Sequence, residues 1–195
     1  MNCRPWQIVF VAALASCARD GGTGRSTAAP QDYALGRAVA PAEIAAYDID
    51  VGPDGAGLPP GRGTASQGTL VYNAKCAACH GAGGAGVYPL YPALVGRDPR
   101  AAEFLFATDP NLKRTIGDYW PYATTVFDYV RRAMPFANPG SLTNDETYAV
   151  TAYLLAANKI IPADAVLDSA SLAAVRMPSR DRFVGDTRRG GSEVR

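Results

Sequence analysis

The stretch Cys76-Ala77-Ala78-Cys79-His80 decides how the rest of this 195-residue sequence is interpreted. The chain has four cysteines and one histidine, and this pentapeptide holds two of those cysteines and the histidine. The other two, Cys3 and Cys17, lie near the N-terminus, in a part of the chain that we expect to be a leader and its processing site. The pentapeptide therefore carries the cysteine and histidine chemistry of the remaining chain.

Two cysteines separated by two residues and followed directly by a histidine are the attachment pattern for c-type haem. The thiols of Cys76 and Cys79 would add to the porphyrin vinyl groups, which leaves His80 beneath the iron as an axial ligand. A structural zinc site needs four ligands, one more than these side chains supply. A thioredoxin-like redox pair would need no adjacent histidine and would be expected between a strand and a helix, and a plain structural disulfide is the remaining alternative. The pattern predicts one covalent haem c.

A haem iron in an electron carrier usually takes a sixth ligand opposite the histidine, and methionine is a common choice. Two methionines follow the motif. Met134 precedes Pro135 in a loop whose prolines restrict the backbone, which suits it to hold a thioether against iron. Met177 lies in an arginine-rich C-terminal segment and is the weaker candidate, and an open or water-bound iron is the third alternative. We predict Met134 as the sixth ligand.

The N-terminal segment is predicted to be an export signal. Residues 1–16 contain a positive charge followed by the apolar run 5–15, which is shorter than the about 20 residues needed to span a bilayer. The end of this segment, Leu14-Ala15-Ser16-Cys17, resembles a bacterial lipobox, which implies cleavage before Cys17 and a lipid on its thiol. An ordinary signal peptide without lipid is the alternative. Both interpretations predict a periplasmic protein, and the first holds it to a membrane only through lipid.

Composition excludes several classes of protein. Lys and Arg number 19 against 18 Asp and Glu, so the chain lacks the basic surplus of a nucleic-acid-binding protein. The 20 glycines and 15 prolines indicate long loops, which argues against a simple helical bundle. The apolar fraction of 48% is sufficient for a folded core.

The sequence also suggests how the chain is divided. We expect a signal peptide, a flexible linker, an extended lead-in wrapped on the domain, a haem domain and a C-terminal extension, at residues 1–16, 17–40, 41–64, 65–160 and 161–195. The arginine-rich segment from residue 176 onward is expected to be solvated and mobile, with contact to an acidic partner or to lipid as the alternative.

One helix is expected to lead into the cysteine motif, and another is expected to lead into the Met134 loop. The first begins near Thr64 or Ser66 and runs to about Ala78, so that it delivers the cysteine motif at its C-terminal end. The second covers residues 122–133, where apolar side chains recur at helical spacing, and it leads directly into the Met134 loop.

A third helix is expected over residues 145–157. It opens with Thr143-Asn144-Asp145-Glu146, which has the pattern of a capping box. One face of this helix carries small residues, so the first helix should approach it closely at Gly68 and Tyr72. No run alternates long enough to predict a sheet, and the predicted fold class is all-α.

The order of these elements resembles class I cytochromes c. Pro92-Ala93-Leu94-Val95-Gly96 is similar to the P-x-L-x-G element that follows the haem motif in that family. The resemblance implies that the Pro92 carbonyl accepts a hydrogen bond from the second ring nitrogen of His80, which fixes the tautomer and raises the basicity of the ligand. It also implies that Arg97 or Trp120 meets a haem propionate.

A closer resemblance links the chain to cytochrome subunits of bacterial sulfur oxidation, namely the SoxD subunit of sulfane dehydrogenase and the haem subunits of molybdenum sulfite dehydrogenases. It rests on residues 115–125 (TIGDYWPYATT) and 131–136 (RRAMPF). The lead-in at 35–59 and the segment 177–181 (MPSRD) are similar too, so the likeness covers about residues 35–184. One departure is that SoxD carries two haem domains, whereas this sequence has one haem motif.

The resemblance implies an electron-transfer protein rather than an enzyme. It would be the electron-accepting subunit or partner of a sulfite or sulfane dehydrogenase that contains molybdenum, and it would pass electrons to a downstream cytochrome or oxidase. A general electron shuttle is the alternative. A haem enzyme would need a distal catalytic histidine, and this sequence has no histidine besides His80. The alternative without haem is a lipoprotein scaffold in which the two cysteines form a disulfide. With three lysines in the chain, docking should rely mainly on apolar contacts. Arg131 and Arg132 either add to this docking surface or form an ordinary solvated helix face.

Overall fold

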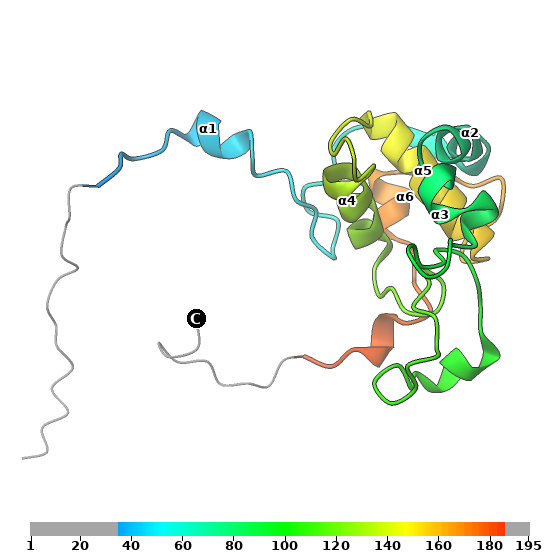
Figure 1. Ribbon diagram of the computed structural model, residues 1–195. Coiled ribbons are helices and arrows are strands. Elements are labelled where there is room, and N and C mark those ends of the chain that lie inside the picture. Colours follow the sequence, from blue (N-terminus) through cyan, green and yellow to red (C-terminus); the bar gives the residue numbers. More distant parts are fainter. Residues whose placement is uncertain (1–34, 186–195) are drawn as a thin grey trace, which may run out of the picture. The chain divides into compact units, whose positions relative to one another are not determined.

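The computed structural model describes residues 35–185 (Figure 1). The predicted signal peptide, Cys17 and most of the linker lie outside the described residues, as does the C-terminal extension from residue 186 onward. All helices and strands among the described residues belong to the unit that begins at Ala40. These elements are α1 (Pro41–Ala45), β1 (Arg62–Thr64), α2 (Ala65–Lys75), α3 (Ala77–His80), η1 (Ala82–Gly84), η2 (Pro99–Glu103), α4 (Ala123–Ala133), α5 (Asn144–Ala157), β2 (Val166–Asp168), α6 (Ser169–Ala173) and η3 (Arg180–Arg182). None of these helices is long and apolar enough to cross a membrane.

The helix α2 begins where its capping signal predicts. The Oγ1 of Thr64 accepts a hydrogen bond from the Gln67 amide at 3.2 Å, and the Gln67 side chain accepts one from the Thr64 amide at 2.9 Å. The helix stops at Lys75, earlier than expected, because Cys76 leaves the helical conformation with φ −124° and ψ −35°. The last four residues of the motif therefore form the separate one-turn helix α3, and Cys76 lies between this helix and α2.

The helices α2 and α5 pack against each other as the small residues predict. A Cβ atom built on Gly68 would overlap the Ala149 carbonyl and the Tyr153 side chain, so only glycine permits this approach. Tyr72 is fully buried, and its ring centroid lies 4.9 Å from that of Tyr153. The predicted contact at Gly68 and Tyr72 is confirmed.

The helices α4 and α5 were also expected from local signals, and both form. Thr143 caps α5 by accepting the Glu146 amide at 3.2 Å, while the Glu146 carboxylate accepts the Thr143 amide at 2.9 Å. The buried ring of Phe127 on α4 meets Tyr148 on α5 at a centroid distance of 4.5 Å. The core between the helices is thus apolar and aromatic, and the all-α fold class is confirmed.

A short ribbon was not expected. The strands β1 and β2 pair antiparallel, with Gly63 opposite Leu167. Each strand has three residues, too few to show an alternating pattern in the sequence. The ribbon joins the start of α2 to the C-terminal extension, whose Leu167 and Leu172 are buried in the core.

The lead-in contacts α4 through backbone groups. The amide of Val51 is buried and donates to the Asp128 carboxylate at 2.9 Å, and Arg131 donates to the Ile49 carbonyl at 2.9 Å. Arg132 pairs with the same Asp128 carboxylate. Both arginines thus have partners within the domain, while the Arg132 side chain stays 46% exposed, and their role in docking stays a prediction. The lead-in is also not extended throughout, because α1 forms near its start.

The C-terminal extension is attached to the domain up to about residue 183. Met177 is 2% exposed, and the Ser179 hydroxyl donates to the Asp118 carbonyl at 2.6 Å. Arg182 donates to the Ala102 carbonyl at 2.6 Å. The expectation of a solvated, mobile tail is wrong for residues 177–183, because buried apolar and hydroxyl side chains alternate with the exposed arginines.

Candidate haem site

Two residues of the cysteine motif share one backbone carbonyl as their hydrogen-bond acceptor. The amides of Cys79 and His80 both donate to the Cys76 carbonyl, at 3.2 and 2.9 Å. Both thiols are free, with Cys76 half-buried and Cys79 exposed. Burial raises the pKa of the Cys76 thiol, and the charge of Lys75 opposes that shift. One helical turn therefore brings two accessible thiols and the imidazole together.

His80 has the surroundings of a neutral ligand. Its Nδ1 is buried and has no hydrogen bond of normal geometry among the described residues. Burial lowers the pKa of His80, and the Pro92 carbonyl acts in the opposite direction. This carbonyl is therefore close to the ring but is not a hydrogen-bonded acceptor here. A half-buried imidazole whose buried nitrogen faces a carbonyl fits an iron ligand that uses its other nitrogen.

The loop after the motif brings Pro92 toward His80. The amide of Gly86 donates to the His80 carbonyl at 2.8 Å, and a Cβ atom on Gly86 would overlap the Pro92 backbone. The amide of Leu94 donates to the Gly84 carbonyl at 2.8 Å. Gly84 and Gly86 have φ values of +80° and +82°, which glycine adopts at no steric cost. Residues 92–96 are thus hydrogen-bonded to and closely packed against the loop that follows the histidine.

Tyr91 is a site residue that the sequence did not reveal. Its ring centroid lies 6.1 Å from that of His80 in an edge-on arrangement. The neighbouring Cys79 side chain raises the pKa of Tyr91. The chain has 10 tyrosines, and no local pattern sets this one apart.

The two candidate methionines lie in different environments. Met134 is half-buried directly after α4, where its amide donates to the Val130 carbonyl at 3.2 Å. Met177 is buried in the hydrophobic core. Core packing accounts for Met177, whereas Met134 lies at the start of an irregular loop. The ligand role of Met134 stays a prediction.

Comparison with known proteins identifies the family. A model of cbb3-type cytochrome c oxidase subunit III matches residues 63–154. The crystal structure of the sulfane dehydrogenase SoxCD from Paracoccus pantotrophus contains a chain that is 41% identical, with a TM-score of 0.69 over 80% of this chain and 73% of that chain. The protein is a SoxD-like c-type cytochrome. No curated protein matches it.

Membership of this family confirms part of what the motif predicted. A cytochrome c domain binds haem c covalently and transfers electrons, and the similarity to SoxCD links this SoxD-like cytochrome to sulfur oxidation. Within residues 35–185, no group of three or more His, Cys, Asp or Glu side chains forms a separate metal site. The roles assigned to Cys76, Cys79, His80 and Met134 stay predictions that the geometry permits.

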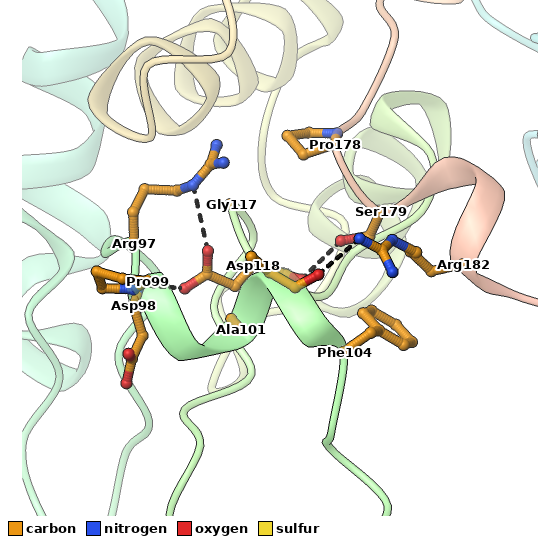
Figure 2. Close-up of a pocket in the computed structure, with 11 residues that line it drawn as sticks. Arg97, Asp98, Pro99, Ala101, Phe104, Gly117, Asp118, Pro178, Ser179 and Arg182 are labelled. Atoms are coloured by element: carbon orange, nitrogen blue, oxygen red, sulfur yellow. Dashed lines mark hydrogen bonds and ion pairs between the residues drawn. The ribbon is translucent and has the colours of Figure 1, made fainter.

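The two residues predicted to meet a propionate already have partners in the cytochrome. The Nε of Arg97 lies 3.2 Å from Asp118, and the Trp120 indole N–H donates to Thr125 at 2.8 Å. Figure 2 shows Asp118 between Arg97 and Ser179, at a surface hollow of about 350 Å³. The arginine side chain is 47% exposed, so its outer nitrogens are accessible. The propionate contacts stay predictions.

Proposed function

We propose that this chain is a periplasmic mono-haem cytochrome c that accepts single electrons from a sulfite or sulfane dehydrogenase. The thiols of Cys76 and Cys79 would hold one haem c, and His80 and Met134 would bind its iron. The proposal rests above all on the one-turn helix α3 and the Cys76 that precedes it, which together bring both thiols close to an imidazole whose Nδ1 is buried. The 41% identity to a chain of SoxCD supports the link to a sulfur dehydrogenase.

When bound, haem c supplies an Fe(III)/Fe(II) couple. The protein's part is to hold the same two ligands in both redox states, so that little rearranges during transfer. His80 ends α3, and its carbonyl is tied to the Gly86 amide. Met134 directly follows α4, whose buried face packs in the core. Ligands placed at the ends of packed helices suit this task.

The dehydrogenase partner is expected to dock by apolar contact near Cys79. Residues 81–96 contain no charged side chain, and Tyr88 and Leu90 are 97% and 76% exposed. Phe136, close to Met134 in sequence, is 86% exposed. An uncharged surface of this kind should give an association that depends little on salt. Electrons then pass to a downstream cytochrome or oxidase.

The chain is proposed to be a periplasmic lipoprotein, with a signal peptide ending at residue 16 and a lipid on Cys17. This part rests on the lipobox-like sequence. It is tested by fractionating cells that express the full chain or Cys17→Ser. Membrane-bound wild type and a soluble, haem-loaded variant support the anchor. If the wild type and Cys17→Ser divide equally between the membrane and soluble fractions, the lipid anchor is refuted.

A general electron shuttle to a terminal oxidase is the second candidate. The match of residues 63–154 to subunit III of a cbb3-type oxidase favours it. Both candidates need the same haem, so they differ in the electron donor alone.

Haem binding is tested first, with the full chain expressed together with a cytochrome c maturation system. We expect one haem per chain by pyridine haemochrome assay and a haem stain that survives denaturation. Cys76→Ser with Cys79→Ser should abolish that stain. Met134→Leu should lower the midpoint potential and open the iron to carbon monoxide, whereas Met177→Leu, the matched control in the core, should do neither. The opposite result for the two methionines would exchange their roles.

The donor is tested by adding the oxidised cytochrome to periplasmic extract with sulfite or thiosulfate. Fast reduction that requires both extract and substrate supports the sulfur dehydrogenase. Reduction by ascorbate, with none by either substrate, removes the sulfur assignment and leaves the general shuttle.

A further inference from the structure

Asn158, which follows α5, has a side chain that bridges two parts of the domain. The residue is fully buried, and its Nδ2 donates to the Leu94 carbonyl at 3.1 Å and to the Leu154 carbonyl at 2.8 Å. Its Oδ1 accepts the Gly96 amide at 3.1 Å. Both amide hydrogens and the amide oxygen are used. A side chain of this size that offers two donors and an acceptor must be asparagine.

The segment that Asn158 holds has no regular structure of its own. Its Leu94 carbonyl also accepts the Ile116 amide at 3.1 Å, and its Gly96 carbonyl accepts the Thr115 hydroxyl at 2.8 Å. Behind the amide, a Cβ atom built on Gly117 would lie 2.6 Å from the Asn158 Oδ1. The Asn158 side chain is therefore enclosed by the segment 94–96 and by Gly117.

We propose that Asn158 is a positioning residue for the haem ligand His80, because it fixes Leu94 and Gly96 and thereby keeps the Pro92 carbonyl facing the buried Nδ1. The inference rests on the proposed ligation of iron by His80. One residue separates Pro92 from Leu94. A shift of the Asn158 side-chain amide would therefore move the Leu94 carbonyl, and this movement would reach the Pro92 carbonyl through two peptide units. The same segment is tied to Gly84, in the loop that follows the histidine.

This role has a consequence for the redox equilibrium. A carbonyl that faces Nδ1–H polarises that bond and makes the imidazole a stronger donor to the metal, which favours the oxidised iron. Releasing the segment should weaken that interaction. Loss of Asn158 is therefore expected to raise the midpoint potential.

The test compares haem-loaded full chains of wild type, Asn158→Leu, Gly117→Ala and Leu172→Ala. Asn158→Leu removes the amide without adding charge, and we expect its reduction equilibrium constant to rise about tenfold, which is 59 mV for one electron. Gly117→Ala pushes on the amide and should give a smaller rise. Leu172→Ala, a fully buried residue of α6, should destabilise the fold without changing the potential. Exchange of the Nδ1 proton in the reduced protein should quicken in the first two variants only.

An unchanged potential in haem-loaded Asn158→Leu would overturn the inference, as would an equal rise in Leu172→Ala. If Asn158→Leu does not accumulate, Gly117→Ala decides by exchange of the Nδ1 proton, because its Cβ atom would also lie 2.8 Å from the Arg97 Cδ and a shift of Arg97 changes the potential by a separate route. Unchanged exchange would overturn the inference. Absence of covalent haem in the wild type would instead refute the proposed function, so the two failures are distinguishable.

Discussion

The α2–α5 pair and the irregular segments 49–60 and 92–120 are stabilised by different kinds of interaction. The helices meet through shape, with Gly68 against Ala149 and Tyr72 on Tyr153. The irregular segments rely largely on single polar side chains that bind backbone groups, such as Asp128, Asn158 and Asp118. The helix pair should therefore be sensitive to added volume, whereas the segments should be sensitive to the loss of one hydrogen-bonding group.

The largest expected effect comes from adding volume between the helices. Gly68→Val places a branched side chain where a Cβ already overlaps the Ala149 backbone. We expect the free energy of unfolding to fall by about 3 kcal/mol, since packed helices cannot separate without losing their core. Urea unfolding of the haem-loaded protein measures it. Gly185→Ala, with nothing within 4 Å of its Cβ position, is the control and should change nothing. A stable Gly68→Val would show that the helices are not closely packed there.

The same difference explains what could be predicted from the sequence. The signals for α2, α4 and α5 are local, since capping residues and apolar spacing lie within each helix. The pentapeptide is local too, and it predicted the haem. The ribbon, the contact of Tyr91 with His80 and the bridge from Asn158 depend on residues far apart in the chain. Such contacts leave no pattern in a single sequence.

A second prediction challenges the comparison, because part of segment 92–120 is held by aromatic packing. The ring of Phe183, from the C-terminal extension, lies 5.2 Å from Phe104 and 5.4 Å from Tyr119. Phe183→Ala removes two edge-to-face contacts and should lower the free energy of unfolding by about 2 kcal/mol. Val184→Ala, at a neighbouring side chain that is 94% exposed, is the control. Equal stability of the two variants would mean that the extension does not hold this segment.

The third prediction concerns pH and the lead-in. Burial raises the pKa of Asp128, but hydrogen bonds from Arg132 and the Val51 amide outweigh it, so the pKa in the folded protein is lowered. The carboxylate therefore stabilises the fold fully above its unfolded pKa of about 3.9, and this contribution is lost as the pH falls further.

Asp128→Asn should cost about 1 kcal/mol at pH 7 and should make the loss of stability below pH 4 shallower. Urea unfolding at pH 7, 4 and 3 measures both effects. The exposed Asp164→Asn serves as the control and should keep the wild-type slope. An identical slope for Asp128→Asn would show that this carboxylate does not anchor the lead-in.

The smallest effect is expected from a polar atom inside the helix pair. Thr151 is fully buried on α5, and its hydroxyl has no hydrogen-bond partner among the described residues. Thr147, one turn earlier, is equally buried but donates to the Thr143 carbonyl at 2.8 Å. Thr147→Val should therefore lower the free energy of unfolding by about 1 kcal/mol, whereas Thr151→Val should leave it unchanged or raise it by about 0.5 kcal/mol. If the two valine variants lose equal stability, the Thr151 hydroxyl has a partner, and the helix pair relies on hydrogen bonding as the irregular segments do.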